Sequence, residues 1–232
     1  MAPDEERRSG AFPPGFFERA DPMPDEVFYA PPRLVTHIDD RAIAAVGALY
    51  AELGIRGEVL DLMGSWVSHF VDTPRALTVL GMNEVELANN PQASATVIHD
   101  LNADPRVPFD DGTFDDAVCC ASVDYLIEPI AVFRDVARVL RPGGRFVCTF
   151  SNRCFPTKAI RGWLVSSDEQ RCAIVVQYFR EASMPDGSVP ERPGRVWPVR
   201  VWEEPVVETR LEARPFVDPL FAVWSRSVHS TT

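Results

Sequence analysis

Residues 100–150 read DLNADPRVPFDDGTFDDAVCCASVDYLIEPIAVFRDVARVLRPGGRFVCTF. After an acidic turn comes a continuous apolar run, Asp116 to Ala121, of the kind found in strands buried on both faces. Pro129 then opens a helical pattern, because proline is favoured at the first position of a helix. Apolar residues recur on one face of that helix until Pro142-Gly143-Gly144 ends it, and a second strand, residues 145–150, follows. This order predicts half of an open α/β sheet, an architecture typical of cofactor-binding enzymes.

The chain before this segment continues the same alternation. Asp39 or Asp40 is the expected N-cap of a helix that runs to Gly54. Three short apolar runs then predict strands at Glu58–Leu62, Leu77–Met82 and Ala95–His99. The first strand leads through Met63-Gly64-Ser65 into an expected short helix that carries His69, whereas His99 in the third is expected to be a core residue.

The chain after residue 150 closes the fold. Ser167 and Gln170 have the spacing of a capping box and predict a helix. A Pro/Gly-rich loop over residues 184–198 follows, and the remaining sequence predicts one or two closing strands. We therefore expect an α/β fold with a Rossmann-like, mostly parallel sheet and helices on both faces, in one domain over residues 35–232.

Residues 1–34 predict an irregular, Pro-rich N-terminal arm. Seven prolines stand in residues 1–32 with charged residues between them, so regular structure is not expected before about residue 35. The arm is nevertheless rich in large apolar side chains: Phe12, Phe16, Phe17, Phe28 and Tyr29. Such side chains favour an arm that lies across the body of the domain, over the mouth of a pocket.

The amino-acid composition restricts the classes of partner that this chain is expected to bind. The chain has 232 residues, of which 46% are apolar and 25% charged, and a formal net charge of −11. That charge repels phosphate backbones and argues against nucleic acid as the main partner. No run of about 18 apolar residues occurs, so no membrane partner is expected. The five cysteines are odd in number and lack C-x-x-C spacing, which indicates core thiols of a cytoplasmic protein and no metal site.

Ligands of an open α/β sheet bind outside the carboxyl ends of the strands. The function of this chain is therefore expected at four strand ends: residues 61–66, 83–84, 100–101 and 121–125.

At those strand ends the chain resembles a class I S-adenosylmethionine (SAM)-dependent methyltransferase of the small-molecule group called type 11. The resemblance covers roughly residues 40–180. VPFDDGTFDDAVCCASVDYLIEP followed by RVLRPGGRF carries it most specifically, and PRLVTHIDD, VLDLMGSWVSH and TFSNRCFPTKAI also resemble an uncharacterised subgroup of that family. The resemblance implies SAM as the cofactor, a small molecule as the methyl acceptor, and EC 2.1.1 chemistry. It specifies neither the acceptor, the atom methylated nor the oligomeric state.

The resemblance also implies the cofactor-binding residues. Asp61 matches the acid that anchors the glycine loop and the amino-acid end of SAM, and Gly64 and Ser65 follow in that loop, although Met63, Ser65 and Val67 stand at the family's glycine positions. Asn83 stands where the family has a carboxylate for the ribose, so either its amide oxygen or neighbouring Glu84 is expected there. Asp100 and Leu101 match the adenine site, and Ala121 and Ser122 lie beside the methionine part.

Methyl transfer needs alignment of the acceptor with the methyl group, plus a base where the acceptor is a hydroxyl. His37, Asp124 and Tyr125 are the candidates for that base. A capping or surface role is the alternative for His37, and a structural role for the other two. Arg33 either pairs with a carboxylate, of SAM or of an acidic substrate, or is simply exposed.

Two other functions remain open. The non-standard glycine loop and Asn83 suit a non-catalytic, methyltransferase-like module that binds a protein partner, which an open pocket over Gly64, not plugged by Met63 and Trp66, would argue against. A nicotinamide-dependent oxidoreductase is the other alternative, although no G-x-G-x-x-G follows the first strand.

Overall fold

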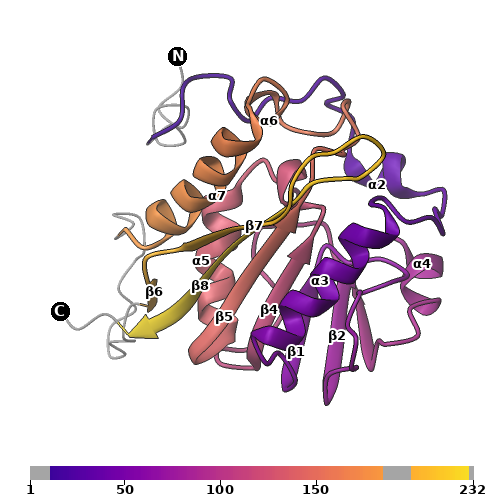
Figure 1. Ribbon diagram of the computed structural model, residues 1–232. Coiled ribbons are helices and arrows are strands. Elements are labelled where there is room, and N and C mark those ends of the chain that lie inside the picture. Colours follow the sequence, from indigo (N-terminus) through magenta and orange to yellow (C-terminus); the bar gives the residue numbers. More distant parts are fainter. Residues whose placement is uncertain (1–10, 185–199, 230–232) are drawn as a thin grey trace.

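The computed structural model describes residues 11–184 and 200–229, so most of the predicted loop at 184–198 lies outside the described residues. One eight-stranded mixed sheet organises this part of the chain (Figure 1). Its order is β3-β2-β1-β4-β5-β8-β6, with β7 also paired to β8. The first five strands in this order are parallel to one another, and β8 runs antiparallel to β5, β6 and β7. The strands are β1 (Glu58–Leu62), β2 (Ala76–Gly81), β3 (Ala95–Ile98), β4 (Phe114–Cys120), β5 (Leu140–Phe150), β6 (Arg200–Trp202), β7 (Val206–Leu211) and β8 (Leu220–His229).

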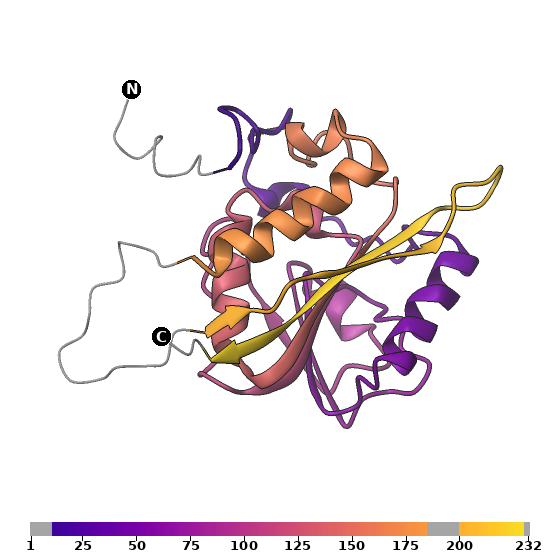
Figure 2. The ribbon, with the colours of Figure 1, turned by 60° about the vertical axis from the view of Figure 1, so that its left-hand side comes forward.

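Helices cover both faces of the sheet (Figures 1 and 2). On one face lies α3 (Asp40–Glu52), and on the other lie α5 (Pro129–Val139) and α7 (Asp168–Ala182). The shorter helices are α2 (Asp25–Tyr29), α4 (Glu84–Ala88), the 3-10 turn η1 (Val123–Tyr125) and α6 (Arg161–Leu164). The predicted fold class is therefore confirmed.

Successive side chains of β1 point to opposite faces of the sheet and pack in two separate apolar clusters. Leu60 packs in one apolar cluster with Phe133 of α5, whereas Val59 packs in the other with Val46 of α3. Since side chains of a strand alternate between faces, Asp61 lies on the same face as Val59. An acidic side chain is thereby placed at the end of β1, beneath the loop that leaves the strand.

Local signals in the sequence define the helix starts. The Asp39 carboxylate accepts hydrogen bonds from the backbone N–H groups of Arg41 at 2.9 Å and Ala42 at 2.8 Å, which caps α3 as predicted. Pro129 stands in the first turn of α5, and Ser167 with Gln170 forms the predicted capping box of α7.

The structure corrects several expected elements. No helix follows β1, because residues 63–75 cross to β2 without regular structure, and His69 in that crossing has a left-handed φ of 60°. The arm holds a short helix, α2, where no regular structure was expected. Strand β5 starts at Leu140, ahead of Pro142-Gly143-Gly144, and three closing strands are present where one or two were expected.

The described part of the arm packs on the body, as predicted. Phe12 is buried against Tyr178 of α7, with ring centroids 5.5 Å apart. Further along, the fully buried Lys158 ammonium lies 3.1 Å from the Asp25 carboxylate and donates to the carbonyl oxygen of Met23 at 2.7 Å. The Arg19 guanidinium pairs with the same carboxylate at 2.8 Å. Because breaking a buried ion pair costs about 3–5 kcal/mol, this cluster holds α2 firmly in place.

None of the helices within the described ranges combines the length and apolarity needed to cross a membrane.

Candidate active site

A pocket with about 820 Å³ of space between its walls lies at the carboxyl ends of the parallel strands. We call it the main pocket. Residues from the arm, the loop after β1, the ends of β2 to β4 and the segment after β5 line it: Asp25, Tyr29, Arg33, His37, Met63, Gly64, Ser65, Gly81, Met82, Asn83, Glu86, His99, Asp100, Leu101, Asn102, Ala121, Ser122, Tyr125 and Phe155.

A second recess of about 500 Å³ adjoins it, and we call this the Asp61 hollow. It shares His37, Met63 to Ser65, Ala121 and Ser122 with the main pocket. Asp61, Trp66 and His69 line the hollow but not the main pocket. The two recesses together follow the ends of four strands, as the sequence predicts.

The loop after β1 keeps a glycine-like backbone without the usual glycines. Met63 has a left-handed φ of 56°, a conformation that glycine adopts without strain. The Gly64 N–H donates to the carbonyl oxygen of Leu80 at 2.9 Å, which holds the loop against β2. A Cβ on Gly81 would stand 2.3 Å from the Gly64 carbonyl oxygen, so only glycine permits this crossing. Gly64 and Gly81 therefore bring the loop down onto the sheet and leave the pocket above it open.

Asp61 lies buried beneath that loop. Burial raises the pKa of its carboxyl to about 7, an effect that a hydrogen bond from Ser68 only partly offsets. Nearby, burial lowers the pKa of His69 to about 4, and its Nδ1 has no hydrogen-bond partner among the described residues. A buried acid and an unpartnered imidazole nitrogen are both suited to receive the ammonium group of a ligand.

Asn83 joins the end of β2 to the arm. Its side-chain nitrogen donates to the carbonyl oxygens of Tyr29 at 2.8 Å and Ala30 at 3.0 Å, and its side-chain oxygen accepts from the Glu86 N–H at 3.1 Å. A carboxylate could not make the first two bonds, because it has no donor. The asparagine at this position is therefore explained by the arm that it holds.

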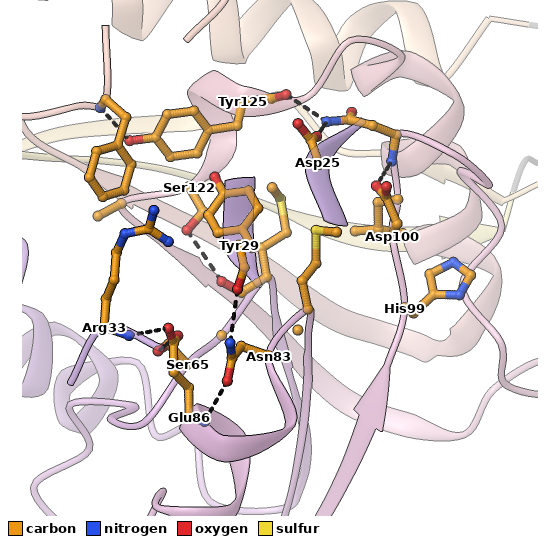
Figure 3. A pocket seen from close by; sticks show the side chains of 18 of the residues that line it. Asp25, Tyr29, Arg33, Ser65, Asn83, Glu86, His99, Asp100, Ser122 and Tyr125 are labelled. Carbon is orange, nitrogen blue, oxygen red and sulfur yellow. Dashed lines mark hydrogen bonds between the residues drawn. The ribbon is translucent and has the colours of Figure 1, made fainter. Parts of the chain in front are cut away.

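Glu86 presents the carboxylate at this strand end. One oxygen accepts from the Arg33 backbone N–H at 2.6 Å and the other from the Ser65 hydroxyl at 2.5 Å (Figure 3). Two bonds leave part of its acceptor capacity unused. Glu84, the alternative expected at this strand end, is exposed and lines neither recess, whereas Glu86 lines the main pocket. Asn83 and Glu86 have N-x-x-E spacing, which is the spacing of a capping box. This spacing is the sequence signal that places Glu86 beside Asn83 at the start of α4.

Asp100 and Leu101 form the opposite end of the main pocket. One Asp100 carboxylate oxygen accepts from the Asn102 N–H at 2.8 Å, and the Leu101 N–H donates to no acceptor in the described part of the chain. His99 lies beside them, half-buried, where it was expected in the core. Its Nε2 bonds the carbonyl oxygen of Asp104 at 2.8 Å.

The end of β4 forms the wall between the two recesses. Ala121 has a left-handed φ of 52°, and its N–H donates to the carbonyl oxygen of Thr149 at 2.8 Å. The Ser122 hydroxyl, which has one proton to donate, lies 3.0 Å from the carbonyl oxygen of Cys120 and 3.3 Å from that of Met63. The polar end of this strand thereby supports the loop that carries Met63.

The three candidate bases have different surroundings. His37 lines both recesses, and its ring centroid lies 5.2 Å from that of Phe155. Desolvation lowers the pKa of His37 below its ordinary value. The Tyr125 hydroxyl lies in the main pocket and accepts from the Phe155 N–H at 2.8 Å. Asp124 is buried and lines neither recess, which favours a structural role for it.

Arg33 and Phe155 line the main pocket, although no sequence motif marks either of them as a site residue. Arg33 comes from the arm and Phe155 from the segment after β5, and only the folded chain brings them together.

Comparison with known proteins agrees with this fold and site. A family model described as "Methyltransferase domain" matches residues 64–148, which run from the loop after β1 into β5. Among curated proteins, a demethylmenaquinone methyltransferase of Mycolicibacterium gilvum is 47% identical over 47 residues, 20% of this chain. The match spans about a fifth (21%) of that relative's length.

Solved structures share the fold at low sequence identity. A chain of the Haloferax volcanii complex between the Trm112 methyltransferase activator and a putative methyltransferase is 15% identical, with a TM-score of 0.54 over 82% of this chain and 92% of that one. The Burkholderia thailandensis 1,6-didemethyltoxoflavin-N1-methyltransferase, solved with S-adenosylhomocysteine, is 13% identical with a TM-score of 0.53 over 82% and 80%. A Thermotoga maritima SAM-dependent methyltransferase is 14% identical, with a TM-score of 0.52 over 79% and 91%.

The strand order, the site at the strand ends and these similarities define the fold of a class I methyltransferase. The methyltransferase-domain model matches residues 64–148 of this chain, a part of the chain that lies within this fold.

Proposed function

We propose that this chain transfers the methyl group of SAM to a small-molecule acceptor. One observation carries the proposal: three acids, Asp61, Glu86 and Asp100, line two adjoining recesses along the ends of β1, β2 and β3. Their order along the strand ends matches the order of the ammonium, ribose and adenine groups along a SAM molecule.

Each acid fits its part of the cofactor chemically. Asp100 would accept from the adenine amino group, and the free N–H of Leu101 would donate to a ring nitrogen. Glu86 has acceptor capacity left for the ribose hydroxyls, and Asp61 with His69 would receive the ammonium group. The close packing of Gly64 on Gly81 keeps the floor low enough for the chain of the methionine part.

SAM supplies a methyl carbon as a sulfonium: the acceptor atom bonds to that carbon, the carbon–sulfur bond electrons return to sulfur, and the acceptor proton goes to a base. His37 is the base that we favour, because it lines both recesses and its lowered pKa keeps the imidazole neutral at pH 7. Asp25, Tyr29 and Arg33 of the arm form part of the pocket wall.

A small acceptor is supported by the names of two similar proteins. Those names refer to demethylmenaquinone and 1,6-didemethyltoxoflavin as acceptors of the relatives. The open pocket over Gly64 counts against the non-catalytic alternative, since neither Met63 nor Trp66 plugs it.

Isothermal titration calorimetry with S-adenosylhomocysteine tests the proposal. We expect binding at a 1:1 ratio, and weakening by about tenfold or more in Asp100→Ala with little change in thermal stability. Asp110→Ala, at an exposed turn, is the matched control and should bind as the wild type does. No binding by the wild-type chain at millimolar ligand would refute the function itself.

A further inference from the structure

Aromatic rings and backbone carbonyl groups hold the Arg33 guanidinium in the main pocket. Its guanidinium carbon lies 4.5 Å from the ring centroid of Phe28, 5.6 Å from that of Phe155 and 5.9 Å from that of Tyr29. Two of its N–H groups donate to backbone carbonyl oxygens, those of Phe28 at 2.8 Å and Pro31 at 3.3 Å. These contacts fix the orientation of the group before any ligand binds.

The charge of Arg33 has no acidic partner among the described residues. The acids of the pocket are engaged elsewhere: Asp25 with Arg19 and Lys158, and Glu86 with the backbone N–H of Arg33 and with Ser65. A guanidinium has five N–H donors, so about three remain after the two carbonyl contacts. That number suffices for a bidentate bond to a carboxylate.

The position of Arg33 separates its ligand from the proposed ammonium site, although its backbone N–H bonds Glu86, the acid proposed for the ribose. Arg33 lines the main pocket but not the Asp61 hollow, where the amino-acid end of SAM is placed. Figure 3 shows its guanidinium turned toward Tyr29 and Tyr125, with Asp100 and His99 on the opposite side of the pocket. Phe155, one of the rings beside the guanidinium, lies near Tyr125 in turn, with ring centroids 6.0 Å apart.

We propose that the methyl acceptor is a planar aromatic acid whose carboxylate pairs with Arg33 and whose ring packs on the aromatic side chains around it. This inference rests on the proposed methyltransferase function and adds the class of its substrate. His37 lies against Phe155 on the same side of the pocket, within reach of an acceptor anchored in this way. Arg33 and the aromatic walls together select charge and shape, because an isolated charge would bind acids of any form.

The test compares planar acids with their neutral primary amides on the full-length protein saturated with S-adenosylhomocysteine. Benzoate, indole-2-carboxylate and quinoline-2-carboxylate, each with its amide, are titrated and followed by saturation-transfer NMR. We expect each acid to bind at least tenfold more tightly than its amide. Arg33→Gln should remove that difference while changing the affinity for S-adenosylhomocysteine by less than threefold.

Two further variants keep the test decisive. Arg33→Lys retains the charge but not the fork of donors, so the preference for acids should fall to an intermediate value. Arg56→Gln removes the same charge from an exposed position and should leave the preference intact. Thermal melting of each variant identifies any loss of folding, and Arg33→Lys decides the matter if Arg33→Gln does not fold.

Other results would overturn the inference. Equal binding of acids and amides, or no binding of either at 5 to 10 mM (roughly the weakest useful range on the affinity scale), would show that Arg33 selects no anionic acceptor. A tenfold or greater loss of S-adenosylhomocysteine affinity in Arg33→Gln would assign the residue to the cofactor carboxylate instead. Failure of the wild type to bind S-adenosylhomocysteine would remove the underlying function, which separates that failure from the others.

Discussion

The backbone N–H of Arg33 donates to the Glu86 carboxylate at 2.6 Å, and this bond joins the N-terminal arm to the first helix after β2. The arm and the cofactor site thus share an acid. The part of the arm around Arg33 is a wall of the site, and it is positioned by the same carboxylate that we propose for the ribose.

Glu86→Ala should weaken the binding of S-adenosylhomocysteine by about 10- to 100-fold, because hydrogen bonds to a charged group contribute roughly 1.5–3 kcal/mol. Calorimetry measures the change. Glu84→Ala is the matched control on the same helix, at an exposed position, and should bind normally. Equal losses in the two variants would show that the ribose has been assigned to the wrong acid.

Asn83→Asp restores the acid of the family pattern, yet it should weaken cofactor binding. The new carboxylate oxygen would face the carbonyl oxygens of Tyr29 and Ala30, which now accept hydrogen bonds from the asparagine. Leaving such acceptors unpaired costs about 1–3 kcal/mol, and the arm should loosen. Faster proteolysis of the arm and weaker S-adenosylhomocysteine binding are expected, whereas tighter binding would contradict this account of Asn83.

Met63→Gly should be tolerated. The left-handed φ of 56° strains a residue with a side chain by about 1–2 kcal/mol, and glycine removes that strain. The gain offsets the lost packing and the greater freedom of glycine in the unfolded chain. Thermal melting and calorimetry should both give values near wild type.

Gly81→Ala, by contrast, should destabilise the chain and abolish cofactor binding, because its Cβ would strike the Gly64 carbonyl.

Cofactor affinity should fall at acidic pH. The Asp61 carboxyl has a pKa of about 7, so it is half protonated near neutral pH in the free protein. A bound ammonium group stabilises the carboxylate, which means that binding below pH 7 must release a proton. The dissociation constant of S-adenosylhomocysteine should therefore rise by up to about tenfold per pH unit below 7. Asp61→Asn should bind weakly with a flat profile, and an unchanged slope in this variant would assign the proton elsewhere.

Asp124→Asn should stabilise the chain at alkaline pH. Burial raises the pKa of the Asp124 carboxyl from 3.8 to about 7. A raised pKa means that the carboxyl favours folding most below pH 4, and that this contribution is lost as the pH rises through 7. The amide resembles the protonated acid and carries no charge, so the gain above pH 8 should be roughly 1–3 kcal/mol. Urea unfolding at pH 5 and pH 8.5 measures it; a larger gain at pH 5 would contradict the expected sign.

Sequence patterns predicted most helices and strands correctly because the interactions behind these patterns join residues that are close in the chain. The Asp39 cap, Pro129 at the start of α5 and the capping box of α7 act within one helical turn, so the neighbouring residues suffice to define them. The crossing at residues 63–75 was predicted wrongly because its backbone is held by long-range contacts. Those contacts are the packing of Gly64 on β2 and the bonds of Gln92 to Phe70.

The residues that we propose for cofactor binding fall into the same two groups, local and long-range. Asp61, Asp100, Leu101, Ala121 and Ser122 follow their strands directly, and parallel strands bring their carboxyl ends to one edge, so order along the chain placed them. The choice between Glu84 and Glu86 depended on which face of α4 met the pocket. That face is set by Asn83 and the arm, 53 residues away from Glu86 along the chain.

The sequence by itself predicted the α/β class and a ligand site at the strand ends, because strand periodicity, turn residues and strand-end acids are local features. Only the tertiary structure decided what the arm does. Asn83 donates to arm carbonyls, Glu86 takes the place expected of its neighbour, and Arg33 meets Phe155 across more than a hundred residues. Contacts between segments so distant in the chain depend on the packing of the whole domain, and no periodicity within either segment encodes them.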